Sequence, residues 1–350
     1  MVNVGIVGYG YWGPNLVRNF YSATDCYVKS VADARPERLQ SLSRVFPAIE
    51  GKLRADEIIY DSEIDAVIIA TPVSTHFPLA KKALLAGKHV LMEKPMTASV
   101  LEAEILINLA AQKNLLLMVD HTFLYTGAVE KMKQLVDSEE IGRLKYLDST
   151  RINLGLFQQD INVLWDLAPH DLSILNYVID DQPFSVNATG ITHTHNGIEN
   201  IAYLTVNYSS GFIAHFNCSW TSPVKLRMML IGGDRKMILY NDLEPTEKIK
   251  VYDTGYSHTT DEEKKKVMVD YRTGDIHVPK INTCEALLGM ANDFISSIKS
   301  GKQPRSSWKI GYNVVRILEA SNRSIKHNGR EVQLENIRRI KHNKSELLIN

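Results

Sequence analysis

Short apolar runs alternate with helical patterns through the first third of the chain. Because each run is apolar at successive positions, we expect strands buried on both faces, as in a parallel sheet covered by helices. The predicted strands cover residues 2–7, 27–32, 66–70, 89–92 and 115–119, and the predicted helices cover 14–21, 36–46, 78–86 and 101–113. This pattern predicts an α/β domain over residues 1–120, with a parallel sheet of the Rossmann type.

The pattern changes after residue 140, where apolar and polar positions alternate along longer segments. Such alternation is typical of an antiparallel sheet with one covered face. We therefore expect an α+β domain over residues 121–334 with a large, mostly antiparallel, open sheet, followed by a polar tail over 335–350. The predicted strands are 145–153, 185–195, 201–208, 212–220, 226–231, 236–240, 248–252 and 266–271, and the predicted helices are 164–178, 285–298 and 311–325.

An open sheet covered by helices on one face leaves its other face to be covered. Two sets of alternating positions are candidates for that contact: Ile201, Tyr203 and Thr205, and then Phe212, Ala214 and Phe216. A second copy of the chain would bury them, which predicts a homodimer or homotetramer formed through the sheet. The alternative is that the domain's own helices cover these side chains.

Composition narrows the class of protein. The 350 residues carry 40 Lys and Arg against 40 Asp and Glu, so the net charge is zero. A zero balance weighs against nucleic acid and against a polybasic membrane anchor as partners. The first residues lack the pattern of a signal peptide, and the sequence has no apolar stretch long enough to span a membrane. Three widely spaced cysteines suit a reducing compartment, so we expect a cytoplasmic protein.

The most specific local motif is Gly8-Tyr9-Gly10-Tyr11-Trp12-Gly13, which follows the first predicted strand and opens the first predicted helix. Glycines at this spacing allow a tight turn, a close approach of the backbone to a pyrophosphate, and close helix–strand packing. The helix N-terminus then offers free N–H groups to phosphate. Gly8, Gly10, Tyr11, Trp12 and Gly13 are therefore predicted to contact a dinucleotide; a glycine-rich turn without a ligand is the alternative.

An acidic residue ends the second predicted strand. Asp33 lies where a carboxylate accepts hydrogen bonds from the hydroxyls of the adenosine ribose and repels a 2′-phosphate, which favours NAD over NADP. Arg35 and Arg38 follow directly and would tolerate a 2′-phosphate. In the alternative interpretation, Asp33 only caps the helix that begins at Pro36.

The loops after the next two strands are also expected at the cofactor, because the carboxyl ends of parallel strands line the ligand crevice. Thr71, Pro72 and His76 belong to the first of these loops, although His76 could equally be a solvated residue of the first helical turn.

Glu93 and Lys94 belong to the second loop, where Pro95 stiffens the turn and its peptide bond can be cis. Lys94 would then reach into the crevice and bond a substrate hydroxyl, whereas a surface salt bridge with Glu93 is the alternative.

A third group lies on the predicted helix over 164–178. Asp166 and His170 are four residues apart and share one helix face, and Pro169 between them indicates either the first helical turn or a kink. Histidine is the natural base for removing a hydroxyl proton near neutral pH. A weak surface pair on the helix is the alternative.

Together, the segments GYGYWG, VADAR, ATPVSTH, MEKP and WDLAPHD resemble the glucose–fructose oxidoreductase/inositol dehydrogenase (Gfo/Idh/MocA) family over residues 2–334. The resemblance implies an NAD(P)-dependent dehydrogenase acting on a sugar or cyclitol hydroxyl. It also implies that Lys94, Asp166 and His170 are catalytic: His170 accepts the proton, and Lys94 holds the reacting oxygen and the nicotinamide ribose. The segment 160–165 lacks the glycines of many members, so the substrate is not carried over from any of them.

The resemblance to members with a GYWG opening implies oxidation, at C3 by expectation, of a nucleotide-linked amino sugar or uronate in polysaccharide biosynthesis, with NAD as cofactor. An NADPH-dependent sugar ketoreductase and a non-catalytic dinucleotide-binding regulatory protein are the alternatives. No metal is expected, because His193 and His195 have no local acid or cysteine beside them. Besides Lys94, Asp166 and His170, the polar and aromatic candidates for substrate contact are His121, Thr122, Phe123, Tyr125, Arg151, Asn153, Gln158 and Trp165.

Overall fold

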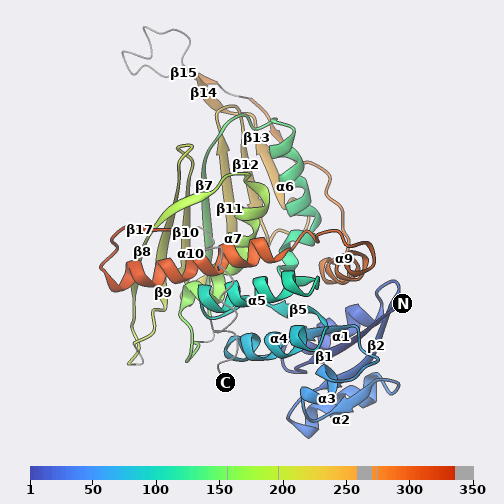
Figure 1. Cartoon of the computed structure of the whole chain (residues 1–350). Helices are drawn as coiled ribbons and strands as arrows, with labels where there is room; N and C mark the ends of the chain where they lie inside the picture. The colour runs from blue at the N-terminus through green and yellow to red at the C-terminus, as the bar shows by residue number, and fades with distance from the viewer. Residues whose placement is uncertain (156, 196, 258–269, 273, 336–350) are drawn as a thin grey trace.

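The computed structural model describes residues 1–155, 157–195, 197–257, 270–272 and 274–335 (Figure 1). Its first sheet confirms the predicted parallel arrangement, with six strands in the order β3-β2-β1-β4-β5-β6. The strands are β1 (Val2–Val7), β2 (Cys26–Ala32), β3 (Glu50–Lys52), β4 (Ala66–Ile69), β5 (His89–Glu93) and β6 (Leu117–Asp120). The direction in which successive strands are added to the sheet reverses at β1, which has β2 on one side and β4 on the other. Ligands of such sheets bind beyond the carboxyl ends of the strands at this switch point.

Five helices of the first domain connect these strands: α1 (Gly13–Tyr21), α2 (Pro36–Val45), α3 (Asp56–Ile59), α4 (His76–Leu85) and α5 (Val100–Gln112). The predicted bounds agree to within about two residues. The short elements β3 and α3 were not predicted, because three or four residues carry too little periodicity to be recognised.

The second sheet is large and mixed, in the order β16-β13-β12-β11-β7-β10-β9-β8-β17. Neighbouring strands are antiparallel except for the central pair β7 and β10, which is parallel. The expected antiparallel open sheet is therefore confirmed in its main feature. Its strands are β7 (Leu144–Leu154), β8 (Pro183–Ile191), β9 (Ile201–Tyr208), β10 (Ile213–Ser219), β11 (Thr221–Gly233), β12 (Met237–Asn241), β13 (Ile249–Tyr252), β16 (Ile276–His277) and β17 (Val332–Gln333).

A separate two-stranded ribbon pairs β14 (Gly255–Ser257) with β15 (Asp270–Arg272). The strand predicted over 266–271 falls mostly outside the described residues, and so does the predicted polar tail, apart from residue 335. The strand predicted over 185–195 ends at Ile191, so His193 and His195 do not alternate on a strand face.

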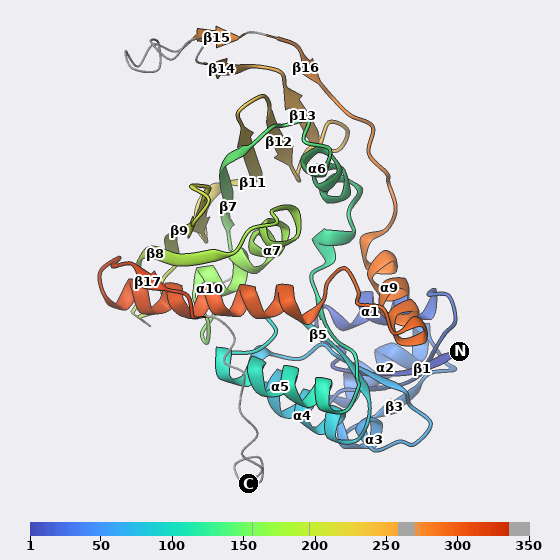
Figure 2. The same ribbon diagram turned by 45° about the horizontal axis from the view of Figure 1, so that its top comes forward.

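Helices cover one face of the second sheet. α7 (Val163–Val178) packs on β7, β9 and β10, and α10 (Trp308–Lys326) packs on β8 and α7. α6 (Gly127–Asp137) lies beside α7 on this side of the sheet (Figure 1). Figure 2 shows α10 running between the second sheet and α5 of the first domain. The two domains are thus joined through a helix from near the end of the chain.

The register of β9 and β10 corrects the expected dimer face. Phe216 pairs with Leu204, and both are buried beneath the helices, whereas Tyr203 pairs with Asn217 on the open face. Ile201 and Thr205 lie on the same open face as Tyr203, while Phe212 and Ala214 are buried like Phe216. The two predicted sets therefore lie on opposite faces. A register depends on which residues pair across strands, which the alternation within one strand does not specify.

α9 (Ala286–Ser300) returns to the first domain and packs on α1. Phe294 meets Phe20 edge-to-face with the ring centroids 6.1 Å apart, and Lys299 pairs with Asp25. The domain division at residue 120 stays a prediction, because this late helix belongs spatially with the early strands. In the part of the chain that the structure describes, no helix is both long and apolar enough to cross a membrane.

Candidate active site

A cleft of about 1200 Å³ opens at the carboxyl ends of the parallel strands and extends to α7 and the second sheet. It contains most of the residues predicted from the sequence. Those that line it are Gly8, Gly10, Tyr11, Trp12, Asp33, Arg35, Thr71, Pro72, Glu93, Lys94, Thr122, Asn153, Gln158, Asp166 and His170. Segments separated by more than a hundred residues therefore meet at one cavity, which is large enough for a dinucleotide and a second ligand.

The glycine loop has the backbone geometry that its motif predicts. Gly8 has φ +104°, and a Cβ there would stand 2.4 Å from the carbonyl oxygen of Ala70. A Cβ at Gly13 would stand 2.4 Å from the oxygen of Gly8, so Gly13 serves helix packing rather than the cleft surface. α1 then begins at Gly13 with its N-terminal N–H groups at the cleft end of β1.

Asp33 is held by two neighbours at the end of β2. Its Oδ2 accepts a hydrogen bond from the Tyr9 backbone N–H at 2.8 Å, and the Arg35 guanidinium donates to both carboxylate oxygens at 2.9 and 3.0 Å. Burial acts to raise the pKa of Asp33, but the hydrogen bonds from Arg35 and Tyr9 outweigh it and hold that pKa below its usual value. Asp33 is therefore ionised, with a half-exposed arginine beside it.

The loop after β4 is joined to the loop after β5 through His76. One ring nitrogen of His76 lies 2.8 Å from the oxygen of Thr71, and the other lies 3.0 Å from the oxygen of Pro95. The side chain is buried and does not belong to the described cleft lining. The Lys94–Pro95 peptide bond is cis. The geometry gives His76 a structural role, in which it positions the Thr71 and Lys94 loops relative to each other.

Lys94 reaches across the cleft to α7. Its Nζ donates a hydrogen bond to the backbone oxygen of Asp166 at 2.9 Å and lies 3.7 Å from Asp166 Oδ1. The other carboxylate oxygen of Asp166 accepts a hydrogen bond from the indole Nε1 of Trp220 at 3.0 Å. The Lys94 amine is thus fixed between the two domains. The Asp166 carboxylate beside it is fixed by the buried Trp220.

α7 presents Asp166 and His170 to the cleft from one face. The Asn162 side chain caps the helix by accepting a hydrogen bond from the Trp165 N–H, and Pro169 lies inside the helix rather than in its first turn. Burial, followed by the positive charges of Lys94, Arg151 and Arg227, lowers the pKa of His170 well below 6.5. The imidazole is therefore neutral near neutral pH, which is the form that accepts a proton.

Two carboxyl groups share the floor of the cleft. Glu93 and Asp120 are paired across β5 and β6, and both side chains line the cavity. Burial and the neighbouring Asp120 charge raise the pKa of Glu93 well above its usual value, and burial also raises the pKa of Asp120. Close like charges do not both ionise readily in a buried site, so the pair retains a proton.

Five predicted substrate contacts lie outside the described lining of the cleft: His121, Phe123, Tyr125, Arg151 and Trp165. Arg151 forms a buried bidentate ion pair with Asp171, with contacts of 2.6 and 2.9 Å, and the Tyr125 hydroxyl donates to Asp293 at 2.7 Å. His121 and Trp165 are buried, and their ring nitrogens have no hydrogen-bond partner among the described residues. Arg151 and Tyr125 instead have their polar groups bonded to carboxylates of other elements.

Sequence reasoning missed Trp220 as a cleft residue. The segment that begins at Asp120 follows a parallel strand, as Glu93 does, and is therefore expected near the nicotinamide; the structure places Asp120 in the cleft lining. Trp220 carried no local signal; it lies between β10 and β11 and reaches the site through the packing of the second sheet.

Comparison with known proteins gives the chain its family. The family model described as "Oxidoreductase family, NAD-binding Rossmann fold" matches residues 2–121, and the "GFO/IDH/MocA C-terminal domain" matches residues 129–238. The chain belongs to the GFO/IDH/MocA family. It is an oxidoreductase, and more specifically a dehydrogenase that acts on a CH–OH group with a nicotinamide cofactor.

Relatives of this GFO/IDH/MocA enzyme act on different substrates. The chain is 30% identical over 245 residues to a UDP-N-acetylglucosamine 3-dehydrogenase of Acidithiobacillus ferrooxidans, a match that covers 67% of this chain and 72% of the relative. It is 26% identical to the NADP⁺-dependent scyllo-inositol 2-dehydrogenase of Bacillus subtilis, over 95% and 96% of the two chains. The structure of the A. ferrooxidans enzyme is similar in fold, with a TM-score of 0.77 and 23% identity over 94% and 99% of the chains.

The cleft of this GFO/IDH/MocA enzyme fits a nicotinamide dinucleotide. The open glycine loop and the α1 N-terminus suit the pyrophosphate, and Asp33 with Arg35 suits the adenosine ribose. Thr71, Glu93 and Lys94 lie farther along the same cleft, toward His170. Among the described residues, no three His, Cys, Asp or Glu side chains gather as metal ligands, and His193 instead bonds to Asn200 at 2.9 Å.

Proposed function

We propose that this enzyme uses NAD to oxidise a ring hydroxyl, at C3, of a nucleotide-linked amino sugar or uronate. The observation that carries the proposal is that Lys94 and His170 line one cavity, with the amine held 2.9 Å from the Asp166 backbone. Alcohol oxidation requires two groups of the protein: a cation that holds the hydroxyl oxygen, and a neutral imidazole that accepts the hydroxyl proton.

The proposed division of labour follows from the charges. When bound, the nicotinamide takes the hydride from the carbon that bears the hydroxyl. A neutral His170 accepts the hydroxyl proton on an imidazole nitrogen, and Lys94 donates a hydrogen bond to the oxygen as its negative charge develops. Asp166 orients the amine of Lys94 through their contact, and Trp220 holds the other carboxylate oxygen of Asp166 in place.

The sugar class draws on the relatives. The A. ferrooxidans relative is named for oxidation at position 3 of UDP-N-acetylglucosamine, and this name supports the C3 and nucleotide elements of the proposal. Asn153, Gln158 and Gly155 line the end of the cleft beyond His170, where polar side chains suit sugar hydroxyls.

An NADPH-dependent sugar ketoreductase is the second candidate, favoured by Arg35. Its guanidinium is half-exposed at the ribose end of the cleft and would attract a 2′-phosphate. Asp33 favours NAD, because its ionised carboxylate repels the same group. A non-catalytic regulatory protein is disfavoured by the joint presence of Lys94 and His170 in the cavity.

The test is a screen of UDP-, dTDP- and GDP-linked sugars for NADH formation, with NADP⁺ run in parallel. A second set with 2-oxoglutarate detects a tightly held cofactor that must be reoxidised in place. Formation of a 3-keto sugar, identified by mass spectrometry after borodeuteride reduction, supports the proposal. Bound NAD without turnover of any sugar would instead support the regulatory alternative.

We further propose a homodimer or homotetramer through the open face of the second sheet, and a cytoplasmic location. Exposed Tyr203 and Ile213 lie on that face, opposite the helices. All three cysteines are described and are free thiols, as in a reducing compartment. Light scattering of wild type and of a Tyr203→Glu variant tests the assembly; an unchanged mass would contradict this interface.

A further inference from the structure

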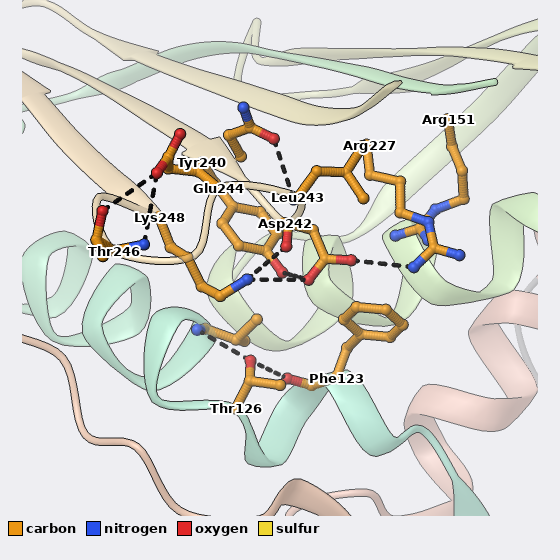
Figure 3. A network of polar contacts seen from close by, with 12 residues as sticks. Phe123, Thr126, Arg151, Arg227, Tyr240, Asp242, Leu243, Glu244, Thr246 and Lys248 are labelled. Carbon is orange, nitrogen blue, oxygen red and sulfur yellow. Dashed lines mark hydrogen bonds and ion pairs between the residues drawn. The ribbon is translucent and has the colours of Figure 1, made fainter. Parts of the chain in front are cut away.

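Figure 3 shows a polar cluster beside Phe123 that the proposed function leaves unused. We call Arg227, Tyr240, Asp242 and Lys248 the Arg227 cluster. Arg227 donates to Asp242 Oδ2 at 3.2 Å, and the Tyr240 hydroxyl donates to Asp242 Oδ1 at 3.1 Å. Lys248 Nζ lies 3.8 Å from Asp242 Oδ1 and also donates to the Asp242 backbone oxygen.

The cluster carries more positive than negative charge. Two cations, Arg227 and Lys248, share the single carboxylate of Asp242, so one positive charge lacks a counterion within the cluster. The nearby carboxylate of Asp171 does not supply the missing negative charge, because it already neutralises Arg151.

Comparison with Arg151 shows that Arg227 is not a closed structural ion pair. Only 4% of the Arg151 side chain is exposed, and it bonds both Asp171 oxygens. By contrast, 37% of the Arg227 side chain is exposed, and among the described residues one of its nitrogens makes a hydrogen bond. The remaining donors of its guanidinium make no hydrogen bond that the described residues supply, so they can hold a ligand.

The cluster lies outside the described lining of the cleft, and contacts through Arg151 and Phe123 connect it to the proposed proton acceptor. Arg227 is paired with Arg151 across β11 and β7, the Arg151 guanidinium stacks 4.9 Å above the Phe123 ring, and Phe123 packs edge-on against His170 at 5.0 Å. Figure 3 shows the two guanidinium groups side by side above Phe123. The charge of Arg227 is also among those that lower the pKa of His170.

We propose that Arg227, supported by Lys248, binds an anionic group of the substrate while the reacting hydroxyl lies at Lys94 and His170. This inference rests on the proposed function and assigns its substrate to sugars that carry an anionic group, which is either a sugar carboxylate or the diphosphate of a nucleotide. A carboxylate or a phosphate would replace the solvent at the free guanidinium donors and supply the missing negative charge. The sequence had given this role to Arg151, whose donors the structure commits to Asp171.

The test compares substrate pairs that differ by a charge: UDP-N-acetylglucosaminuronate against UDP-N-acetylglucosamine, and glucuronate against glucose. In wild type, kcat/KM is expected to favour the acidic member of a pair. Arg227→Gln should reduce that preference by about tenfold or more, because a hydrogen bond to a charged group is lost. Asp242→Asn should increase it, because a competing carboxylate is removed. Arg235→Gln, in the exposed turn at the other end of the β11–β12 hairpin, is the matched control.

The outcomes separate the two proposals. Loss of preference within the carboxylate pairs identifies a sugar carboxylate as the anion, whereas an equal loss for both UDP-sugars, absent from both free sugars, identifies the diphosphate. An unchanged kcat/KM for all four sugars in a folded Arg227→Gln protein overturns the inference, and Arg227→Lys, which keeps the charge, replaces that variant if it fails to fold. If no sugar is oxidised at all, the proposed function fails, and calorimetric binding of the two UDP-sugars to wild type and Arg227→Gln still tests the site.

Discussion

Lys94 and Asp166 are joined by a hydrogen bond of 2.9 Å although 72 positions separate them along the chain. The bond connects the loop after β5 to α7, and therefore connects the parallel sheet to the helix that carries His170. The Lys94 side chain is anchored by its backbone on one domain and by its amine on the other, so it loses little further freedom when a ligand binds. This contact therefore organises the cavity before substrate binds.

Removal of either proposed catalytic group should abolish turnover without removing the cofactor site. His170→Ala is expected to lower kcat by about 10²–10⁴-fold, the usual contribution of a positioned base, and Lys94→Ala should also eliminate measurable turnover. NADH affinity, measured by fluorescence titration, should stay near the wild-type value in both. His327→Ala, an exposed histidine beyond α10, is the control. An unchanged kcat in either catalytic variant would refute its role.

The activity should have an acid limb set by His170. Its pKa is lowered by burial and by nearby cations, so the neutral base persists below pH 6.5 and is lost only at more acidic pH. The profile of kcat/KM is therefore expected to stay flat through pH 6.5 and to fall only at more acidic pH. A rising limb centred above 6.5 would contradict the neutral state assigned to this imidazole.

Substitutions of Asp33 and of Arg35 should shift the preference between NADH and NADPH in opposite directions. Arg35→Ala should weaken NADPH binding by about tenfold and spare NADH, because it removes the cation beside the ribose and frees the Asp33 oxygens. Asp33→Asn should weaken NADH binding and reduce discrimination against NADPH. Dissociation constants of both reduced cofactors provide the readout, with Arg44→Ala in the last turn of α2 as control. Equal effects on the two cofactors would exclude Arg35 as a determinant.

The buried ion pair between Arg151 and Asp171 should matter more for stability than an exposed one. Asp171→Asn leaves a buried guanidinium without its counterion and is expected to cost about 3–5 kcal/mol in the free energy of unfolding. The exposed pair of Lys82 with Asp56 is the comparison, and Asp56→Asn should cost about 1 kcal/mol or less. Urea unfolding measures both. A similar small loss in the two variants would show that Arg151 finds another partner.

The site was only partly predictable, and the failures share a cause. Gly8, Asp33 and Glu93 follow or end predicted strands. The carboxyl ends of parallel strands line the ligand cleft, so the position of these three residues could be inferred from their own segments. Arg151 and Tyr125 also follow from strand and loop positions, but Asp171 and Asp293 capture their polar ends. Which acid an arginine or a tyrosine meets depends on the packing of distant elements.

By itself the sequence determined the parallel sheet and the glycine turn, because both rest on periodicity or spacing within one segment, and it named the candidate groups for proton transfer. Tertiary structure alone decided that Trp220 bonds Asp166, that α9 returns to α1, and that Asp171 buries and neutralises Arg151 while Arg227 stays partly exposed. Those outcomes depend on register and on long-range pairing, where burial and charge neutralisation select one partner among several chemically equivalent ones.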